Sequence, residues 1–173
     1  MNVLECIKTR RSVRKFKSDP VSKDLILKVI EAGTYAATGR NAQSPVIIAV
    51  TDKKLRDEIS ALNAKIYGNE NFDPFYGAPV ILIVAANKAN PTFVYDGSLV
   101  LGNMMLEAHE LNLGSCWIHR AKQSMDYPLY KDLFAKLGIE GEYEGIGHLA
   151  LGYIDGEYPE TKPRKDGWYY FVE

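Results

Sequence analysis

The chain has 173 residues, of which 46% are hydrophobic and 25% charged, and this composition fits a single compact domain, residues 1–173, with a sizeable core. The 21 Lys and Arg residues against 22 Asp and Glu give a formal net charge of -1, so the composition does not favour nucleic acid as a partner. No apolar run reaches the ~18 residues of a membrane span, and no signal peptide follows Met1, so we expect a cytoplasmic protein without membrane contact.

The cysteines and histidines give no sign of a disulfide framework or a metal site. The two cysteines, Cys6 and Cys116, lie far apart in the sequence, and the three histidines form no pair with ligand spacing. Two unpaired thiols fit a reducing compartment. We therefore expect no structural metal.

A basic cluster lies near the start of the chain, where residues 10–16 read Arg-Arg-Ser-Val-Arg-Lys-Phe. Residues 1–28 hold eight cations and three acids, a local balance of +5. Guanidinium groups and a serine hydroxyl together are suited to bind a phosphate or a carboxylate. A solvated surface, a targeting signal or a nucleic-acid arm would also explain such a run, so the cluster alone leaves these alternatives open.

The first third of the chain predicts two helices and a strand. Residues 2–9 favour a short helix, and Asp19 to Ser22 favour a turn with an N-cap for a second helix over residues 23–37. Small and amide-bearing residues then interrupt the helix at 38–45. The apolar run 46–50 is typical of a buried strand, so a polar loop precedes that strand directly.

The middle of the chain predicts an alternation of helices and strands. A helix capped at Thr51-Asp52 is expected to end near Tyr67, followed by an irregular stretch and a strand over 80–86. Residues 96–108 are apolar on nearly every side, as in a helix at the centre of a core or of an oligomer interface. Residues 113–118 predict a third strand.

The last third predicts a helix, a strand and a tail. The helix covers 127–137 and the strand covers 145–153, where we interpret His148 as a core residue with a hydrogen-bond partner. The tail from residue 155 is rich in Pro, Gly, Tyr and Trp and has too few core residues to fold alone. We expect it to pack on the domain or on a partner subunit.

The sequence contains none of the common motifs for phosphate binding or hydrolysis. GxGxxG, GxxxxGK[ST], GxSxG and HExxH are all absent, and no side chain stands out as a catalytic group. Such a protein can still be an enzyme if a bound cofactor performs the chemistry and the chain positions it.

Five segments, taken in order, resemble the FMN-dependent nitroreductase family. They are the basic cluster 10–16, Asn41 to Pro45, Ala78-Pro79, Gly114 to Ile118, and Gly152-Tyr153 with the later Lys162 to Lys165. The resemblance covers nearly the whole chain. It implies an α+β, three-layer sandwich with a mostly antiparallel central sheet flanked by helices, in which two subunits interlock and the tail (about 155–173) of each packs on the other.

The resemblance also implies which residues contact FMN. Arg10 and Ser12, with Arg11 beside them, would bind the phosphate together with Lys162 and Arg164, and Arg14 would reach the pyrimidine edge of the flavin. The remaining implied contacts are polar groups for the ribityl chain and a segment along the flavin ring: Thr38, Asn41, Gln43, Cys116, Trp117, Ile118, His119 and Arg120. For Trp117 and Tyr67 the alternatives are a stacking wall and core packing, of which we favour core packing.

The function implied by the resemblance is that of an FMN-dependent NAD(P)H oxidoreductase. NADH or NADPH would reduce FMN at N5 and leave, and a nitroaromatic, quinone or similar electron-poor acceptor would follow in a ping-pong scheme that needs no catalytic side chain. The alternative is a flavin-binding protein for storage or sensing with little turnover. The chain is short for the family, and His119-Arg120 departs from the acidic or glycine residue of many relatives, so the substrate stays open.

Overall fold

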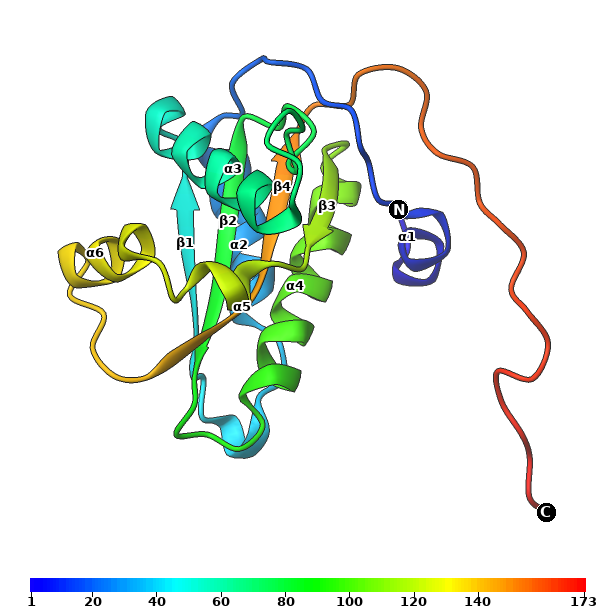
Figure 1. Ribbon diagram of the computed structural model, residues 1–173. Helices are drawn as coiled ribbons and strands as arrows, with labels where there is room; N and C mark the ends of the chain where they lie inside the picture. The colour runs from blue at the N-terminus through cyan, green and yellow to red at the C-terminus, as the bar shows by residue number, and fades with distance from the viewer.

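The computed structural model describes residues 1–173 and contains a four-stranded, fully antiparallel sheet with helices on both faces (Figure 1). Its strands, in the spatial order β1-β2-β4-β3, are β1 (Pro45–Val50), β2 (Val80–Asn87), β4 (Tyr143–Gly152) and β3 (Gly114–Ile118). No helix of the chain has both the length and the apolar composition that crossing a bilayer requires.

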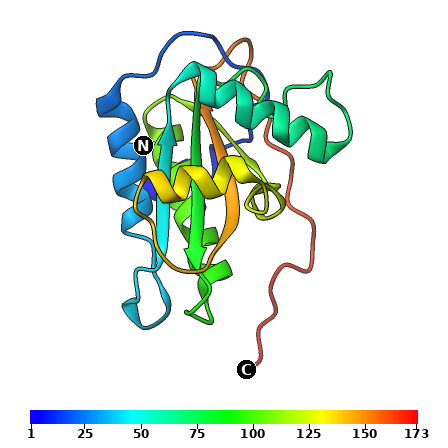
Figure 2. The same cartoon turned by 60° about the vertical axis from the view of Figure 1, so that its left-hand side comes forward.

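The helices form the two outer layers (Figure 2). One face of the sheet carries α2 (Lys23–Thr34) and α4 (Phe93–Glu110), and α1 (Val3–Thr9) lies beside α4. The other face carries α3 (Lys53–Tyr67), α5 (Ala121–Ser124) and α6 (Pro128–Lys136). The predicted α+β three-layer sandwich is therefore confirmed.

The central strand β2 explains how one sheet supports two cores. Leu82 and Val84 pack with Met104 of α4 in the cluster on one face, whereas Ile81 and Ile83 belong to the cluster on the other face. Because both faces are covered, every side chain of the strand from Val80 to Ala86 is apolar and the usual alternation with polar residues is absent. The two clusters share the sheet, which ties both outer layers into one unit.

The predicted helix starts are confirmed at two N-caps. The Ser22 hydroxyl accepts a hydrogen bond from the Leu25 amide, and the Asp52 carboxylate accepts one from the Leu55 amide. Each cap satisfies an amide that has no partner inside the helix. The two largest differences from the predicted boundaries are three residues each: α2 ends at Thr34 rather than at residue 37, because the chain turns there toward β1, and α4 begins at Phe93 rather than at residue 96.

The predicted core role of His148 is confirmed. The side chain is fully buried, and its Nε2 lies 2.5 Å from the Tyr130 hydroxyl. Burial lowers the pKa of His148 to about 3, so the imidazole is neutral at physiological pH.

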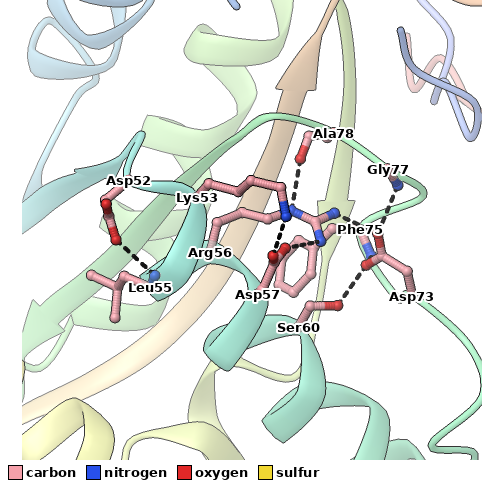
Figure 3. A network of polar contacts seen from close by, with 10 residues as sticks. All are labelled: Asp52, Lys53, Leu55, Arg56, Asp57, Ser60, Asp73, Phe75, Gly77 and Ala78. Atoms are coloured by element: carbon pink, nitrogen blue, oxygen red, sulfur yellow. Dashed lines mark hydrogen bonds and ion pairs between the residues drawn. The ribbon is translucent and has the colours of Figure 1, made fainter. Parts of the chain in front are cut away.

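The loop between α3 and β2 is fixed by one carboxylate (Figure 3). Asp73 accepts hydrogen bonds from the side chains of Arg56 and Ser60 and from the amides of Phe75 and Gly77. Burial alone would raise the pKa of Asp73, but these donors outweigh it, so the pKa lies below its ordinary value. The irregular stretch after α3 is thus an ordered connection.

Candidate functional site

Residues 10–16, which we call the clamp, run along the outer edge of β3. The Val13 amide donates to the Ser115 carbonyl oxygen at 2.9 Å, and Phe16 forms a bridge with Ile154 just beyond β4. Because this segment pairs with an otherwise open sheet edge, its backbone is held by the sheet. The basic cluster of the sequence is therefore an ordered part of the fold and not a loose arm.

The clamp contains a buried cationic donor without a partner. Arg10 Nη1 is inaccessible to solvent and makes no hydrogen bond within the chain. A buried donor left unpaired is costly, and a guanidinium in this state is suited to an anion. The hydroxyl of Ser12 and the exposed Arg14 belong to the same segment. The donor set of the clamp thus fits a phosphate group.

Cys116 of β3 lies against the clamp but is a core residue. Only 3% of its surface is exposed, and it packs in the cluster under α3 and α6. Burial raises the pKa of Cys116, although Arg14, a hydrogen bond with Ser12 and Arg10 oppose the rise. The thiol is therefore protonated at neutral pH and does not provide a nucleophile.

The Arg11 side chain makes hydrogen bonds within its own chain. Its Nη1 donates to the Arg10 carbonyl oxygen at 2.5 Å and its Nη2 donates to the Lys8 carbonyl oxygen at 2.9 Å, so the guanidinium caps the C-terminus of α1. Its backbone amide donates to the Tyr158 hydroxyl at 2.5 Å. Arg11 therefore restrains the backbone of the clamp, and its Nε, like Arg10 Nη1, is buried without a partner.

A second group of predicted residues forms the loop 38–43, which we call the amide loop. The Gln43 amide donates to Thr38 Oγ1 at 3.1 Å, and Gln43 Nε2 donates to Asn41 Oδ1 at 3.2 Å. Asn41 and Gln43 have φ angles of 54° and 48°, in the left-handed region, as does Arg40. The loop holds a particular and sterically unfavourable backbone through its own side chains.

Asp96 anchors the amide loop to α4. This carboxylate is 3% exposed and accepts hydrogen bonds from the Gly39 amide (3.0 Å), Asn90 Nδ2 (2.7 Å) and Thr92 Oγ1 (3.0 Å). A side chain at Gly39 would place its Cβ 2.2 Å from Thr92 Oγ1, so only glycine fits. We did not single out Asp96 from the sequence, although an acid at the start of an apolar helix was a signal for it.

The clamp and the amide loop lie at opposite ends of the sheet (Figure 1). Pro45, just after the amide loop, pairs with Ala86, which pairs with Glu144, whereas Ser115 beside the clamp pairs with Leu151. Seven residues of β4 separate Glu144 from Leu151, which corresponds to roughly 23 Å of strand. One chain therefore does not bring the two groups of predicted contacts together.

The end of β3 places the remaining predicted residues in different surroundings. Ile118 is buried, Trp117 is half-buried against the α4 side of the core, and His119 is exposed. The Arg120 Cζ atom lies 5.0 Å from the centre of the Tyr67 ring, and Arg120 Nε is buried without a partner. Core packing is confirmed for Trp117 but is wrong for Tyr67, which is 57% exposed and lies under a cation.

Residues 159–173 of the tail are all exposed, and the end of the chain extends away from the domain (Figures 1 and 2). Lys162 and Arg164 are exposed, and Arg164 Nη2 donates within the tail to the Lys162 carbonyl oxygen. Neither side chain makes a hydrogen bond or an ion pair with the clamp of its own chain. The large apolar side chains at the end are also uncovered: Trp168, Tyr169, Tyr170, Phe171 and Val172.

Comparison with known protein sequences finds relatives that are named as nitroreductases or NADPH-dependent oxidoreductases. A family model described as "Nitroreductase family" matches residues 7–67 and 64–153. A putative NADH dehydrogenase/NAD(P)H nitroreductase of Methanothermobacter thermautotrophicus is 33% identical over 121 residues, which is 68% of this chain and 60% of that relative. An NADPH-dependent oxidoreductase of Staphylococcus aureus is 25% identical over 94% of this chain and 69% of its own length. The chain thus spans less than two thirds of the first relative.

Solved structures match over the whole chain. A nitroreductase of Bacteroides fragilis with bound FMN superposes with a TM-score of 0.88 at 29% identity, covering 100% of both chains. An FMN-dependent nitroreductase of Clostridium difficile superposes with a TM-score of 0.84 at 26% identity, covering 97% of this chain and 98% of its own.

Proposed function

Because the chain belongs to the nitroreductase family, we propose that it binds FMN and acts as an NAD(P)H oxidoreductase. One observation carries this proposal: Arg10 Nη1 is buried and unpaired in a clamp that also holds Ser12. A phosphate group would satisfy that donor. The similar Bacteroides fragilis structure, which matches this chain over its full length, contains bound FMN.

Each part of the chain has a proposed task toward the cofactor. Arg10 and Ser12 bind the phosphate, and Arg14 places a positive charge beside the pyrimidine edge of the ring. When bound, FMN supplies hydride transfer from NADH or NADPH to an electron-poor acceptor such as a nitroaromatic or a quinone. A fixed cation favours the form of the cofactor that carries negative charge, so Arg14 assists its reduction. Donor and acceptor bind in turn at one place, as in ping-pong kinetics.

The remaining contacts come from β3 and the amide loop. The segment 116–120 lies along the ring, with a backbone amide of His119 or Arg120 as a donor. Thr38, Asn41 and Gln43 supply polar groups to the ribityl chain and the ring edge. Lys162 and Arg164 of the tail add positive charge at the phosphate.

We further propose that the site is completed in a homodimer. The clamp and the amide loop of one chain lie roughly 23 Å apart along β4, so a single cofactor contacts both most simply if they come from different chains. The uncovered aromatic residues of the tail support the same proposal, because a run of exposed large apolar side chains marks an interaction surface.

The test begins with absorbance. Protein purified with FMN present should be yellow. Anaerobic addition of NADH or NADPH should then bleach the flavin band, at least as fast as the turnover measured with a quinone acceptor. Colourless protein that gains no flavin absorbance on titration would contradict FMN binding. Bound flavin that neither donor bleaches would instead favour the alternative, a storage or sensing protein.

A further inference from the structure

The Tyr158 hydroxyl lies between the clamp and α4. It accepts a hydrogen bond from the Arg11 amide at 2.5 Å and lies 3.2 Å from His109 Nδ1, while the Tyr158 ring stacks on the imidazole with centroids 5.2 Å apart and planes 16° from parallel. The other imidazole nitrogen, His109 Nε2, lies 2.8 Å from Thr9 Oγ1. Four residues from α1, the clamp, α4 and the tail thus meet at one point.

One arrangement of the protons satisfies every group of this cluster. Thr9 Oγ1 donates its proton to the Glu5 carbonyl oxygen at 2.8 Å, so it accepts from His109 Nε2. His109 Nδ1 is then free of hydrogen and accepts from the Tyr158 hydroxyl, whose oxygen accepts from the Arg11 amide. In this arrangement His109 is neutral with its proton on Nε2.

The surroundings of His109 favour that neutral form. Burial lowers the pKa of His109, and the charges of Arg10 and Arg11 lower it further, whereas Glu110 opposes them. The titratable and charged groups that face His109 or its Tyr158 partner come from α1, the clamp and α4: Cys6, Arg10, Arg11 and Glu110. The two cations of the clamp therefore act on the imidazole that helps to position it.

The backbone amides of the clamp make few other hydrogen bonds at this point. The Arg10 amide makes the last bond of α1, to the Cys6 carbonyl oxygen, and the Val13 amide makes the first bond to β3. Between them, Tyr158 supplies the only hydrogen bond to the Arg11 amide. The hydroxyl of a tail residue thus sets the backbone from which Arg10 and Ser12 project.

We propose that Thr9, Arg11, His109 and Tyr158 form a tail latch in which Tyr158 and His109 are positioning residues for the anion-binding clamp. The latch couples docking of the tail to retention of FMN, and it opens when His109 takes up a proton. This inference rests on the proposed function for its effect on FMN, whereas the contacts within the latch can be tested on the protein without FMN.

The first test uses Tyr158→Phe, with Tyr143→Phe as the matched control. Tyr143 is also half-buried against a ring, that of Phe134, but its hydroxyl makes no hydrogen bond. In the FMN-free protein, amide hydrogen exchange at Arg11 should be about tenfold faster in Tyr158→Phe, since one hydrogen bond is lost. The FMN dissociation constant at pH 8 should rise roughly fivefold, and the control should change neither value.

The second test is the pH dependence. The folded-state pKa of His109 is lowered, so the latch is fully present above the ordinary histidine value and is lost as pH falls through the folded-state pKa. The ratio of the FMN dissociation constants of Tyr158→Phe and wild type should therefore fall toward one between pH 8 and pH 5. Titration of the FMN phosphate is common to both proteins and cancels in this ratio. In His109→Gln, whose side chain does not titrate, the Arg11 exchange rate corrected for intrinsic exchange should lose its pH dependence.

Two outcomes would overturn the inference. Exchange at Arg11 that is equal in Tyr158→Phe and Tyr143→Phe would contradict the latch itself. A ratio of dissociation constants that stays constant from pH 8 to pH 5 would contradict control by His109. If the wild type binds no FMN, the proposed function and the effect on FMN both fail, and the exchange rate at Arg11 still decides whether the latch exists.

Discussion

At the clamp, Arg10 Nη1 is buried without a partner and Arg14 is exposed to solvent. At the amide loop, in contrast, Thr38, Asn41 and Gln43 bond to one another, and Asp96 accepts three further hydrogen bonds at the base of the loop. The clamp has a buried donor left over for an anion, whereas the backbone of the amide loop is already held by hydrogen bonds within the chain, and the side chains of Asn41 and Gln43 are exposed. Substitutions at the buried base of the amide loop should therefore mainly lower stability, whereas substitutions at the clamp should mainly weaken FMN binding.

The largest expected effect is at the base of the amide loop. Asp96→Ala leaves the donors of Gly39, Asn90 and Thr92 without their acceptor in a buried place. We expect the free energy of unfolding to fall by about 3 kcal/mol in urea titration. The control is Asp132→Ala, at an exposed carboxylate without contacts, which should change it by less than about 0.5 kcal/mol. If Asp96→Ala lowered the free energy of unfolding no more than Asp132→Ala does, the contrast between the amide loop and the clamp would be contradicted.

The next effect is on binding at the clamp. Arg10→Ala should weaken FMN binding by roughly 10- to 100-fold, about 2 kcal/mol, because charge-assisted hydrogen bonds to the phosphate are lost. The free energy of unfolding without FMN should stay within about 0.5 kcal/mol, since Arg10 Nη1 has no partner to lose. Lys17→Ala removes an exposed cation nearby and tests whether charge alone matters. An equal loss of FMN affinity in both variants would contradict a specific clamp.

A smaller effect at the clamp concerns reduction. Arg14→Ala should lower the midpoint potential of bound FMN by on the order of 30 mV, because a cation near the reduced ring is removed. Spectroelectrochemical titration measures this shift, and Arg14→Lys should restore most of it. An unchanged potential in Arg14→Ala would show that the role proposed for Arg14 is wrong.

The smallest effect returns to the amide loop. Arg40 has a φ of 54°, a conformation that costs less for glycine, so Arg40→Gly should raise the free energy of unfolding by about 0.5 kcal/mol. Asn112, at a φ of 58° in the turn before β3, offers the comparison, because asparagine tolerates this region better than arginine. Asn112→Gly should therefore raise the free energy of unfolding by less than Arg40→Gly does. A loss of stability in Arg40→Gly would mean that the Arg40 side chain contributes a contact of its own.

Local patterns were sufficient to predict most of the fold. The N-caps at Ser22 and Asp52 and the apolar runs of β1 and β2 depend on residues close in sequence, and all are confirmed. The short helix α5 was missed because four residues are too few for a periodic pattern.

Long-range contacts could not be predicted in this way. The clamp pairs with β3 across about a hundred positions, and Tyr158 and His109 are 49 positions apart, so no local signal marks either contact. The direct role expected for Arg11 rested on the resemblance of the basic cluster to the family. In the structure, the Arg11 guanidinium donates to the carbonyl oxygens of Lys8 and Arg10 at the end of α1. These bonds depend on where the helix ends, which the sequence does not show.

The central proposal is that the clamp of one chain and the amide loop of another form a single FMN site. The most direct measurement is the FMN stoichiometry of mixed dimers, purified through two different tags, of an Arg10→Ala chain and an Asn41→Ala/Gln43→Ala chain. A shared site predicts one FMN per mixed dimer bound with wild-type affinity, because one site then receives both intact parts, while each parental dimer binds weakly. If both parental dimers bind FMN weakly and the mixed dimer also has no site of wild-type affinity, the proposal is contradicted.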